Sequence, residues 1–256
     1  NLTQIGPRSF FSCKNLGSVT FSDSSKLEII DALSFQMTGL ISINVPSHVR
    51  QIGVNAFNHC EKLSSVNFSE DSELTFIGDS AFSFCSQLQE ITIPSKVQSI
   101  GSSTFSYCAR LKSVTFTKNS ELNSMGVGVF AGTSLERISI PPSVTDIEKY
   151  FGSCKKVTTL EFFTTEFTIN RQILELAPNL NQLVLPNSKK VTVEKGTGKF
   201  TIFVRRDVCL NGPGKSDHII EYIDRLSRPS STIMNKKSAV INGPQSSPIK
   251  ATDTRR

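Results

Sequence analysis

The sequence contains no tryptophan, only three histidines, and no apolar run that would span a bilayer. A membrane-spanning helix needs about 20 consecutive apolar residues, so we expect no transmembrane segment in this chain. The histidines are scattered along the sequence, and no Ser/His/Asp or Cys/His set supports a catalytic site. We therefore expect that the protein is not an enzyme.

Patterns that hold metals or cofactors are also missing. The six cysteines form no C-x-x-C pair, which argues against zinc. The acidic links at Asp23 and at Glu70 and Asp71 offer too few oxygens for calcium, which takes about six to eight. The segment Cys209–Ser216 ends in Gly-Lys-Ser, but Cys209 stands where a phosphate-binding loop needs glycine. We expect neither a metal ion nor a cofactor.

The positive charge is concentrated at the C-terminal end. Seven basic residues and one acidic residue lie between Arg225 and Arg256, which accounts for the whole net charge of +6. Residues 1–224 are therefore neutral overall, and they lack the basic excess of a nucleic-acid-binding domain. We expect no nucleic-acid partner. Ser, Pro, Lys and Asn dominate residues 227–256, which predicts a disordered basic tail.

What the sequence does contain is a repeat, and its clearest copy is Leu74–Pro94. The spacing of three from Phe82 to Cys85 indicates a helical turn. The spacing of two from Ile91 to Ile93 indicates a strand. One such unit is too short to bury its own apolar side, so it needs neighbours, as the repeats of a solenoid do.

The unit occurs eight times between residues 1 and 186, with a degenerate last copy. Proline closes every second strand, because it cannot donate to a ladder. We predict a leucine-rich-repeat solenoid of the α/β type, with about eight coils, one short parallel strand per coil and helical turns opposite. The first seven copies carry phenylalanine at the same place: Phe10, Phe35, Phe57, Phe82, Phe105, Phe130 and Phe151.

The pattern I-G-x-x-A-F-x-x-C-x-x-L-x-x-I-x-I-P-x-x-V resembles the BspA-like class of leucine-rich repeats. Its best copies are Ile52–Phe68, Ile77–Val97 and Ile100–Phe116. The sixth to eighth copies depart from it, with Thr133 at the Cys position and Glu148 in place of Gly.

The resemblance implies a surface antigen of the kind found in mucosal bacteria and protozoan parasites, linked to adhesion. The expected role is a non-catalytic module, cell-surface or secreted, that binds a protein or glycan ligand. The alternative is a cytoplasmic scaffold whose basic tail binds an acidic partner. Asn1 falls in mid-repeat, so we expect the chain to be a piece of a longer protein. A signal peptide at the native N-terminus would favour the surface role.

Beyond the repeats, residues 187–226 predict a C-terminal cap over the open end of the stack. Lys199–Val204 alternates as a strand, and Asn211–Gly214 has the composition of a turn. Asp217 then caps a predicted short helix over Ile219–Leu226.

Five of the six cysteines occupy one column of the repeat. Neighbouring coils lie about 4.8 Å apart, so stacked cysteines are within reach of a disulfide. Thr38 and Thr133 fill the same position in other copies, which favours a site for small buried side chains. We expect buried free thiols, with disulfides as the alternative. The column is Cys13, Cys60, Cys85, Cys108 and Cys154.

The strand positions that point away from the core form the candidate binding surface. Most of them are small polar residues, which an exposed parallel sheet tolerates, and solenoid surfaces of this kind commonly bind partners. Charged residues interrupt this pattern in the fourth to seventh strands. We predict a partner-binding patch there, formed by Glu90, Lys112, Glu136, Arg137 and Glu161.

Overall fold

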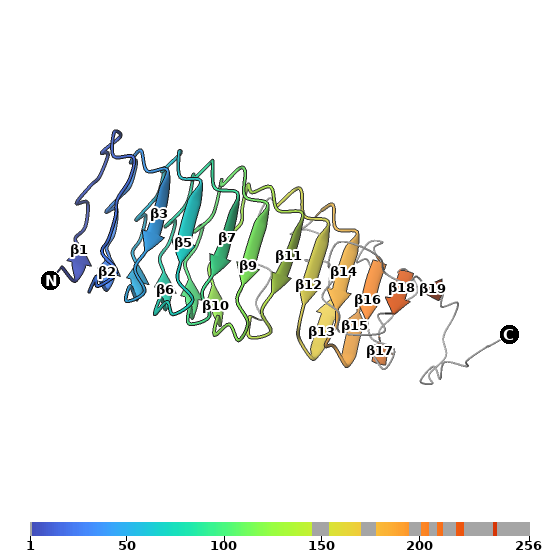
Figure 1. The fold of residues 1–256 in the computed structure, drawn as a ribbon. Coiled ribbons are helices and arrows are strands. Elements are labelled where there is room, and N and C mark those ends of the chain that lie inside the picture. The colour runs from blue at the N-terminus through green and yellow to red at the C-terminus, as the bar shows by residue number, and fades with distance from the viewer. Residues whose placement is uncertain are drawn as a thin grey trace.

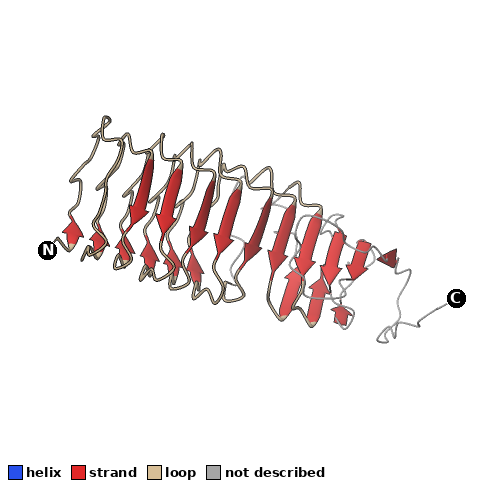
Figure 2. Cartoon of the chain, in the orientation of Figure 1, coloured by secondary structure: helices blue, strands red, loops and turns tan. Residues whose placement is uncertain are grey.

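The structure is a computed structural model, and it describes residues 2–144, 154–169, 178–194, 201–204, 209–211, 219–222 and 238–239. The chain winds into coils that stack one after another from the N-terminus toward the C-terminus (Figure 1). The described residues form strands, turns and loops without a helix (Figure 2). The predicted repeat solenoid is confirmed, whereas the helical part of the α/β description is not found in the described part.

Most described coils contribute strands at two places, where the sequence predicted one, and the first coil contributes only β1. The first strand has two residues in the first six coils, where it holds the Ile position of the I-G pair (Met125 in β10), and three or four residues in β13, β15 and β17. A two-residue strand is too short to show alternation, which is why the sequence pattern missed it. These strands are β1 (Gln4–Ile5), β2 (Ile29–Ile30), β4 (Gln51–Ile52), β6 (Phe76–Ile77), β8 (Ser99–Ile100), β10 (Ser124–Met125), β13 (Glu166–Ile169), β15 (Lys190–Val193) and β17 (Cys209–Asn211).

The second strand of each coil has four residues and begins soon after the repeat leucine. Alternate side chains are buried, as in β7, where Ile91 and Ile93 point into the core. These strands are β3 (Ser42–Val45), β5 (Ser65–Phe68), β7 (Glu90–Ile93), β9 (Ser113–Phe116), β11 (Arg137–Ile140), β12 (Thr159–Phe162), β14 (Gln182–Leu185), β16 (Thr201–Val204) and β18 (Ile219–Tyr222).

Strands of successive coils pair in parallel, so equivalent repeat positions lie side by side. The first six short strands form one sheet, and β13, β15 and β17 form another. The longer strands pair as β3–β5, β7–β9 and β11-β12-β14-β16-β18, with Ile91 of β7 opposite Val114 of β9. A final strand, β19 (Ser238–Ala239), pairs with β18 in the antiparallel sense.

The segment between the two strands is a series of overlapping turns, so the predicted helical turn is wrong. Within the fourth coil, the Ser83 amide donates to the Ser80 carbonyl at 3.1 Å. The intervening Phe82 amide donates instead to the carbonyl of Thr104, in the fifth coil, at 2.9 Å. Amides therefore bond alternately within their own coil and to the next coil, which satisfies backbone groups that would otherwise be buried without partners.

These turns have a left-handed backbone at two positions in each of the first six coils, the third and the seventh after the short-strand Ile or Met. In the sixth coil both are glycine, Gly128 with φ of 66° and Gly132 with φ of 70°. A left-handed residue cannot continue a right-handed helix, which explains why the spacing of three gives no helix here. The other left-handed positions are Arg8, Ser12, Leu33, Met37, Asn55, His59, Ser80, Phe84, Ser103 and Tyr107.

The core is a continuous column of stacked side chains along the solenoid. The rings of Phe57 and Phe82 lie 5.2 Å apart with an interplanar angle of 1°, and both are fully buried. The glycine of the I-G pair permits the close approach of the coils. A Cβ on Gly78 would lie only 2.7 Å from the carbonyl carbon of Gly53 in the preceding coil.

The expected C-terminal cap contains strands that continue the sheet. The predicted strand over Lys199–Val204 is confirmed over Thr201–Val204, which pairs with β14. The predicted helix over Ile219–Leu226 is wrong over Ile219–Tyr222, because β18 pairs in register with β16. The open edge of β16 offers unpaired backbone groups, and pairing with them outweighs a helical spacing of apolar residues. Residues 212–214 of the predicted turn, residues 223–226 and nearly all of the predicted tail lie outside the described residues.

We expect Phe82→Ala to lower the free energy of unfolding by about 3 to 5 kcal/mol, because it removes a fully buried ring from the column. Chemical denaturation measures the change. Phe10→Ala is the matched control, since Phe10 stacks on Phe35 but is 37% exposed. Its loss should be smaller, and a loss below about 1 kcal/mol in the Phe82 variant would place the column elsewhere.

We expect Ser80→Gly to raise the free energy of unfolding by up to about 1 kcal/mol, because glycine adopts φ near 52° without the cost that a Cβ imposes. The matched control is Ser99→Gly in β8, where glycine should weaken the strand. If both variants lost stability equally, the left-handed backbone at Ser80 would not be a source of strain.

Candidate functional site

The structure brings four residues of the predicted patch to the same end of the longer strands. Glu90 and Arg137 are the first residues of β7 and β11, and Lys112 and Glu136 directly precede β9 and β11. All four are exposed. No ion pair joins any two of them among the described residues, so their charges remain available to a partner.

Glu161 does not join these four residues. It is the third residue of β12, opposite Ser139 of β11, and Ser139 Oγ donates a hydrogen bond to its carboxylate. Only 6% of Glu161 is exposed, and every position of β12 is buried. The strand surface is therefore not an open platform at this coil, and the expectation that Glu161 faces solvent is wrong.

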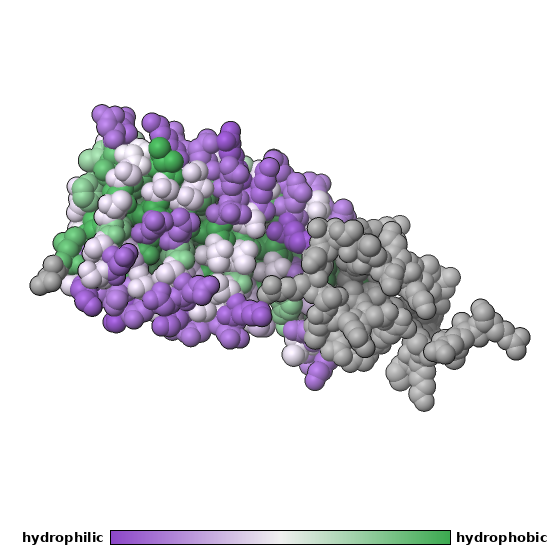
Figure 3. Space-filling model, in the orientation of Figure 1, coloured by the Kyte–Doolittle hydropathy of each residue, from purple (hydrophilic) through white to green (hydrophobic). Residues whose placement is uncertain are grey.

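The polar strand positions of the preceding coils do face solvent. Asn44, Asn67, Thr92 and Thr115 are exposed in adjacent strands, and Asn67 Nδ2 donates to Asn44 Oδ1 at 2.8 Å. Figure 3 shows a paler band along the N-terminal part of the solenoid, between hydrophilic residues on both long edges. Equivalent polar side chains therefore lie side by side on this surface.

The cysteine column has a structural role. Cys60, Cys85, Cys108 and Cys154 are free and buried, which confirms the expected thiols, whereas Cys13 is free and exposed. Each buried thiol donates a hydrogen bond to the core phenylalanine carbonyl of a preceding coil. For example, Cys108 Sγ lies 3.1 Å from the Phe82 carbonyl. Burial raises the pKa of Cys108 and of Cys154 to about 12, so these thiols stay protonated and unreactive at neutral pH.

The structure also shows a surface that the sequence analysis missed. Met37, His59, Phe84 and Tyr107 project outward from the seventh position of successive coils, and we call these four residues the turn ridge. The rings of His59 and Phe84 stack at 4.3 Å, and those of Phe84 and Tyr107 stack at 4.8 Å. Gly132 follows in the sixth coil, where a Cβ would lie 2.9 Å from the Tyr107 ring. Glycine therefore lets the ring lie flat against the next coil.

In the sequence, the turn ridge corresponds to the repeat position directly before the cysteine position. This column contains apolar and aromatic residues in four successive coils, although the position is exposed. The turn ridge was missed in the sequence analysis, which assumed a helical turn. A helical turn contains no left-handed residue that would direct these side chains outward. The column reads Ser12, Met37, His59, Phe84, Tyr107 and Gly132.

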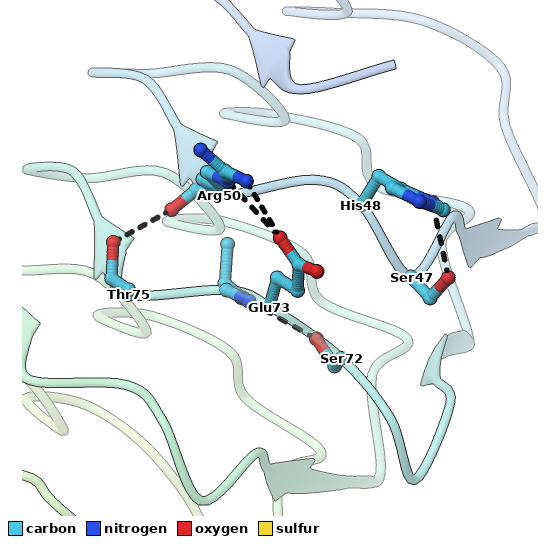
Figure 4. A network of polar contacts seen from close by, with 7 residues as sticks. Ser47, His48, Arg50, Ser72, Glu73 and Thr75 are labelled. Carbon is cyan, nitrogen blue, oxygen red and sulfur yellow. Dashed lines mark hydrogen bonds and ion pairs between the residues drawn. The ribbon is translucent and has the colours of Figure 1, made fainter. Parts of the chain in front are cut away.

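A polar network links the third and fourth coils near the short strands (Figure 4). Arg50 pairs with Glu73 at 3.0 Å, and Thr75 Oγ1 donates to the Arg50 carbonyl at 3.1 Å. His48 lies beside Ser47 in the adjoining loop. The Arg50 side chain is 61% exposed, so the ion pair adds little stability. The network joins neighbouring coils.

Two searches of the described part of the chain bear on other kinds of site. No group of three or more His, Cys, Asp or Glu side chains there could hold a metal ion. No helix there has the length and apolar character needed to cross a membrane.

Comparisons with known proteins agree with the architecture. A family model described as a BspA type leucine rich repeat region matches residues 1–96 and 75–195, with six copies. A leucine-rich repeat protein from Bacteroides ovatus has 19% sequence identity and a TM-score of 0.53, over 85% of this chain and 63% of its own. A leucine rich cell surface protein from Faecalibacterium prausnitzii has 21% identity and a TM-score of 0.40, over 77% of this chain and 64% of its own.

The chain thus spans less than two thirds of the length of either protein. The likeness to the Bacteroides ovatus protein shows the fold. No match to a curated protein was found.

We expect the stability of the fold to fall as the pH rises from about 9 toward 12. The unfolded chain loses its thiol protons near pH 9, whereas buried Cys108 and Cys154 keep theirs until about pH 12. Each such thiol should remove about 1.4 kcal/mol per pH unit in this window.

Urea unfolding at several pH values measures this slope. Cys108→Ser should give a shallower slope, because the hydroxyl does not titrate in this range. Cys13→Ser is the matched control and should leave the slope unchanged, since Cys13 is exposed. Equal slopes for all three proteins would show that the Cys108 thiol is not protected from ionisation.

Proposed function

Because the chain belongs to the BspA-type leucine-rich repeat family, we propose that it is a non-catalytic binding module of a cell-surface or secreted protein. Its ligands would be proteins or glycans of host or neighbouring cells, and its role would be adhesion. Members of this family are known as surface proteins linked to adhesion, which supports the proposal.

The observation that carries the proposal is the in-register strand surface. Parallel pairing places equivalent side chains in columns, with Asn44 opposite Asn67 and Thr92 opposite Thr115. Such a surface presents the same small polar groups repeatedly to an extended partner. Each contact is weak, so useful adhesion would come from several copies that act together.

The charged end of the strands would set where a partner docks. Glu90, Lys112, Glu136 and Arg137 are exposed at the beginnings of β7, β9 and β11. Charges at the edge of an interface steer the encounter and fix its register more than they tighten it. We therefore expect these residues to affect the rate of binding and its salt dependence.

The test compares the protein as a monomer with the protein coupled in many copies to beads. Bead-coupled protein should bind fixed epithelial cells or immobilised extracellular-matrix extract, and the monomer should bind weakly. Arg137→Ala should lower bead binding severalfold, most clearly at low salt. Ser65→Ala, at an equivalent position of β5, is the matched control. Absence of binding by parent beads to both targets would contradict the proposed function.

A further inference from the structure

Basic residues gather in the first, third, fifth and seventh coils, where the coil passes from the turn segment to its longer strand. The connecting segments are residues 14–17, 39–41, 61–64, 86–89, 109–112, 134–136 and 155–158, and they contain six basic and two acidic residues. All six basic residues are exposed. We call them the basic corner: Lys14, Lys62, Arg110, Lys112, Lys155 and Lys156.

Within the described part of the chain, no ion pair joins a residue of the basic corner to an acidic side chain. Glu61 and Glu136 lie in the same segments, with Glu61 Oε1 3.8 Å from His59 Nδ1, so six basic and two acidic residues leave a net charge of +4. Arg110 donates to the neutral Oε1 of Gln87 at 2.6 Å, and Lys156 donates to Ser134 Oγ at 3.0 Å. The corner therefore keeps its positive charge.

The opposite end of the longer strands has the reverse charge. The loops between the longer strand and the next short strand cover residues 22–28, 46–50, 69–75, 94–98 and 117–123. They contain four basic and six acidic residues. Arg50 is paired there with Glu73. The solenoid is therefore polarised across its width, although residues 1–224 are neutral overall.

The turn ridge occupies the second to fifth coils and the basic corner the first, third, fifth and seventh, so the two surfaces overlap in the third and fifth coils. Lys62 follows His59 by three residues, and Arg110 follows Tyr107 by three residues. The two surfaces form one strip that runs along the solenoid axis, apolar on one side and cationic on the other. Phe84 is 38% exposed and Tyr107 is 55% exposed, so the ridge is open to a partner.

The ridge presents the edges of its rings, because the stacked faces cover one another. The interplanar angles are 6° for His59 and Phe84 and 12° for Phe84 and Tyr107. An aromatic ring is negative on its face and positive at its edge. The exposed edges therefore favour carboxylates, as the adjacent lysines and arginine do.

We propose that the turn ridge and the basic corner together bind an extended acidic protein segment whose carboxylates alternate with apolar side chains. The inference deepens the proposed function and rests on it, since it names one kind of ligand for the module. The carboxylates would lie over the basic corner, and the apolar side chains would cover the ridge. Aromatic, Met and Arg residues are common in protein interfaces, which agrees with this composition.

Nucleic acids and glycans fit this strip less well. Single-stranded nucleic acids gain affinity by stacking their bases on exposed aromatic faces. The faces of Phe84 are occupied by His59 on one side and by Tyr107 on the other. Sugar rings would need the same faces for their apolar contacts, and only the ring edges are free.

The probe is a fluorescein-labelled peptide of about ten residues that alternates Glu or Asp with Leu. In extended form it spans roughly 33 Å, which is longer than the four-coil ridge and comparable to the distance from the first to the seventh coil of the basic corner. Fluorescence anisotropy with the full chain should show saturable binding that weakens with salt. A peptide that alternates Glu with Ser, and one that alternates Lys with Leu, should bind at least about tenfold more weakly.

Two double charge-reversal variants distinguish binding at the basic corner from a general effect of the protein's net charge. Lys62→Glu with Arg110→Glu should weaken the peptide affinity by about tenfold or more. Lys26→Glu with Lys96→Glu makes the same change in net charge at the opposite end of the strands, and should change the affinity less than about twofold. Equal losses in the two double variants would overturn the inference.

The ridge is tested by Phe84→Ser with Tyr107→Ser. Ser12 already occupies this position in the first coil with φ of 61°, so serine is compatible with the backbone, and thermal unfolding checks the fold. The double variant should bind the acidic peptide about tenfold more weakly. The remaining binding should still weaken with salt, because the basic corner is unchanged. Unchanged affinity in a folded double variant would overturn the role of the ridge.

Competing polymers and cells complete the test. Tighter binding of heparin oligosaccharide or single-stranded DNA than of the acidic peptide would overturn the inference. If the parent beads bind cells and the beads carrying Lys62→Glu with Arg110→Glu bind equally, the inference fails while the proposed function stands. If the parent binds the peptide as expected but its beads bind neither cells nor matrix extract, the proposed function fails instead.

Discussion

The structure depends on backbone hydrogen bonds that join each coil to the next. In the turn segment, the amides of Ser80, Phe82 and Phe84 all donate forward to carbonyls of the following coil. The I-G pair binds in the other direction, with the Gly78 amide donating back to the Ile52 carbonyl at 2.8 Å. Because both sets must form together, neighbouring coils cannot slip relative to one another, and every repeat position becomes a column.

These columns explain why core and surface features occur together. The register that stacks Phe57 on Phe82 in the core also stacks His59 on Phe84 at the surface. Left-handed residues provide the turn that separates the inward and outward columns, at a cost of about 1 kcal/mol for each side chain other than glycine. The bonds between coils and the buried rings together offset that cost, so the strain of one coil is supported by its neighbours.

The sequence was sufficient to predict the solenoid and its core, because the spacing of Phe82, Cys85 and Leu88 reports burial whatever the backbone conformation. It was not sufficient to predict the conformation itself. A spacing of three fits a helical turn and a series of overlapping turns equally well, and the positive φ of Ser80 and Phe84 leaves no mark in the pattern. Strand β18 was misjudged for a related reason, since its pairing is set by the edge of β16.

The candidate site was only partly predictable from the sequence, because the net charge of a segment does not say on which side of the coil its charged side chains lie. Lys112 belongs both to the predicted patch at the strand ends and to the basic corner, so the strand surface and the basic corner meet at this residue. Lys26 and Lys96 lie at the other end of the strands, where the loops together hold more acidic than basic residues. Only the parallel register reveals that the cations of alternate coils fall on the same side. A solenoid can therefore be neutral overall and still offer one cationic, apolar strip and one acidic edge.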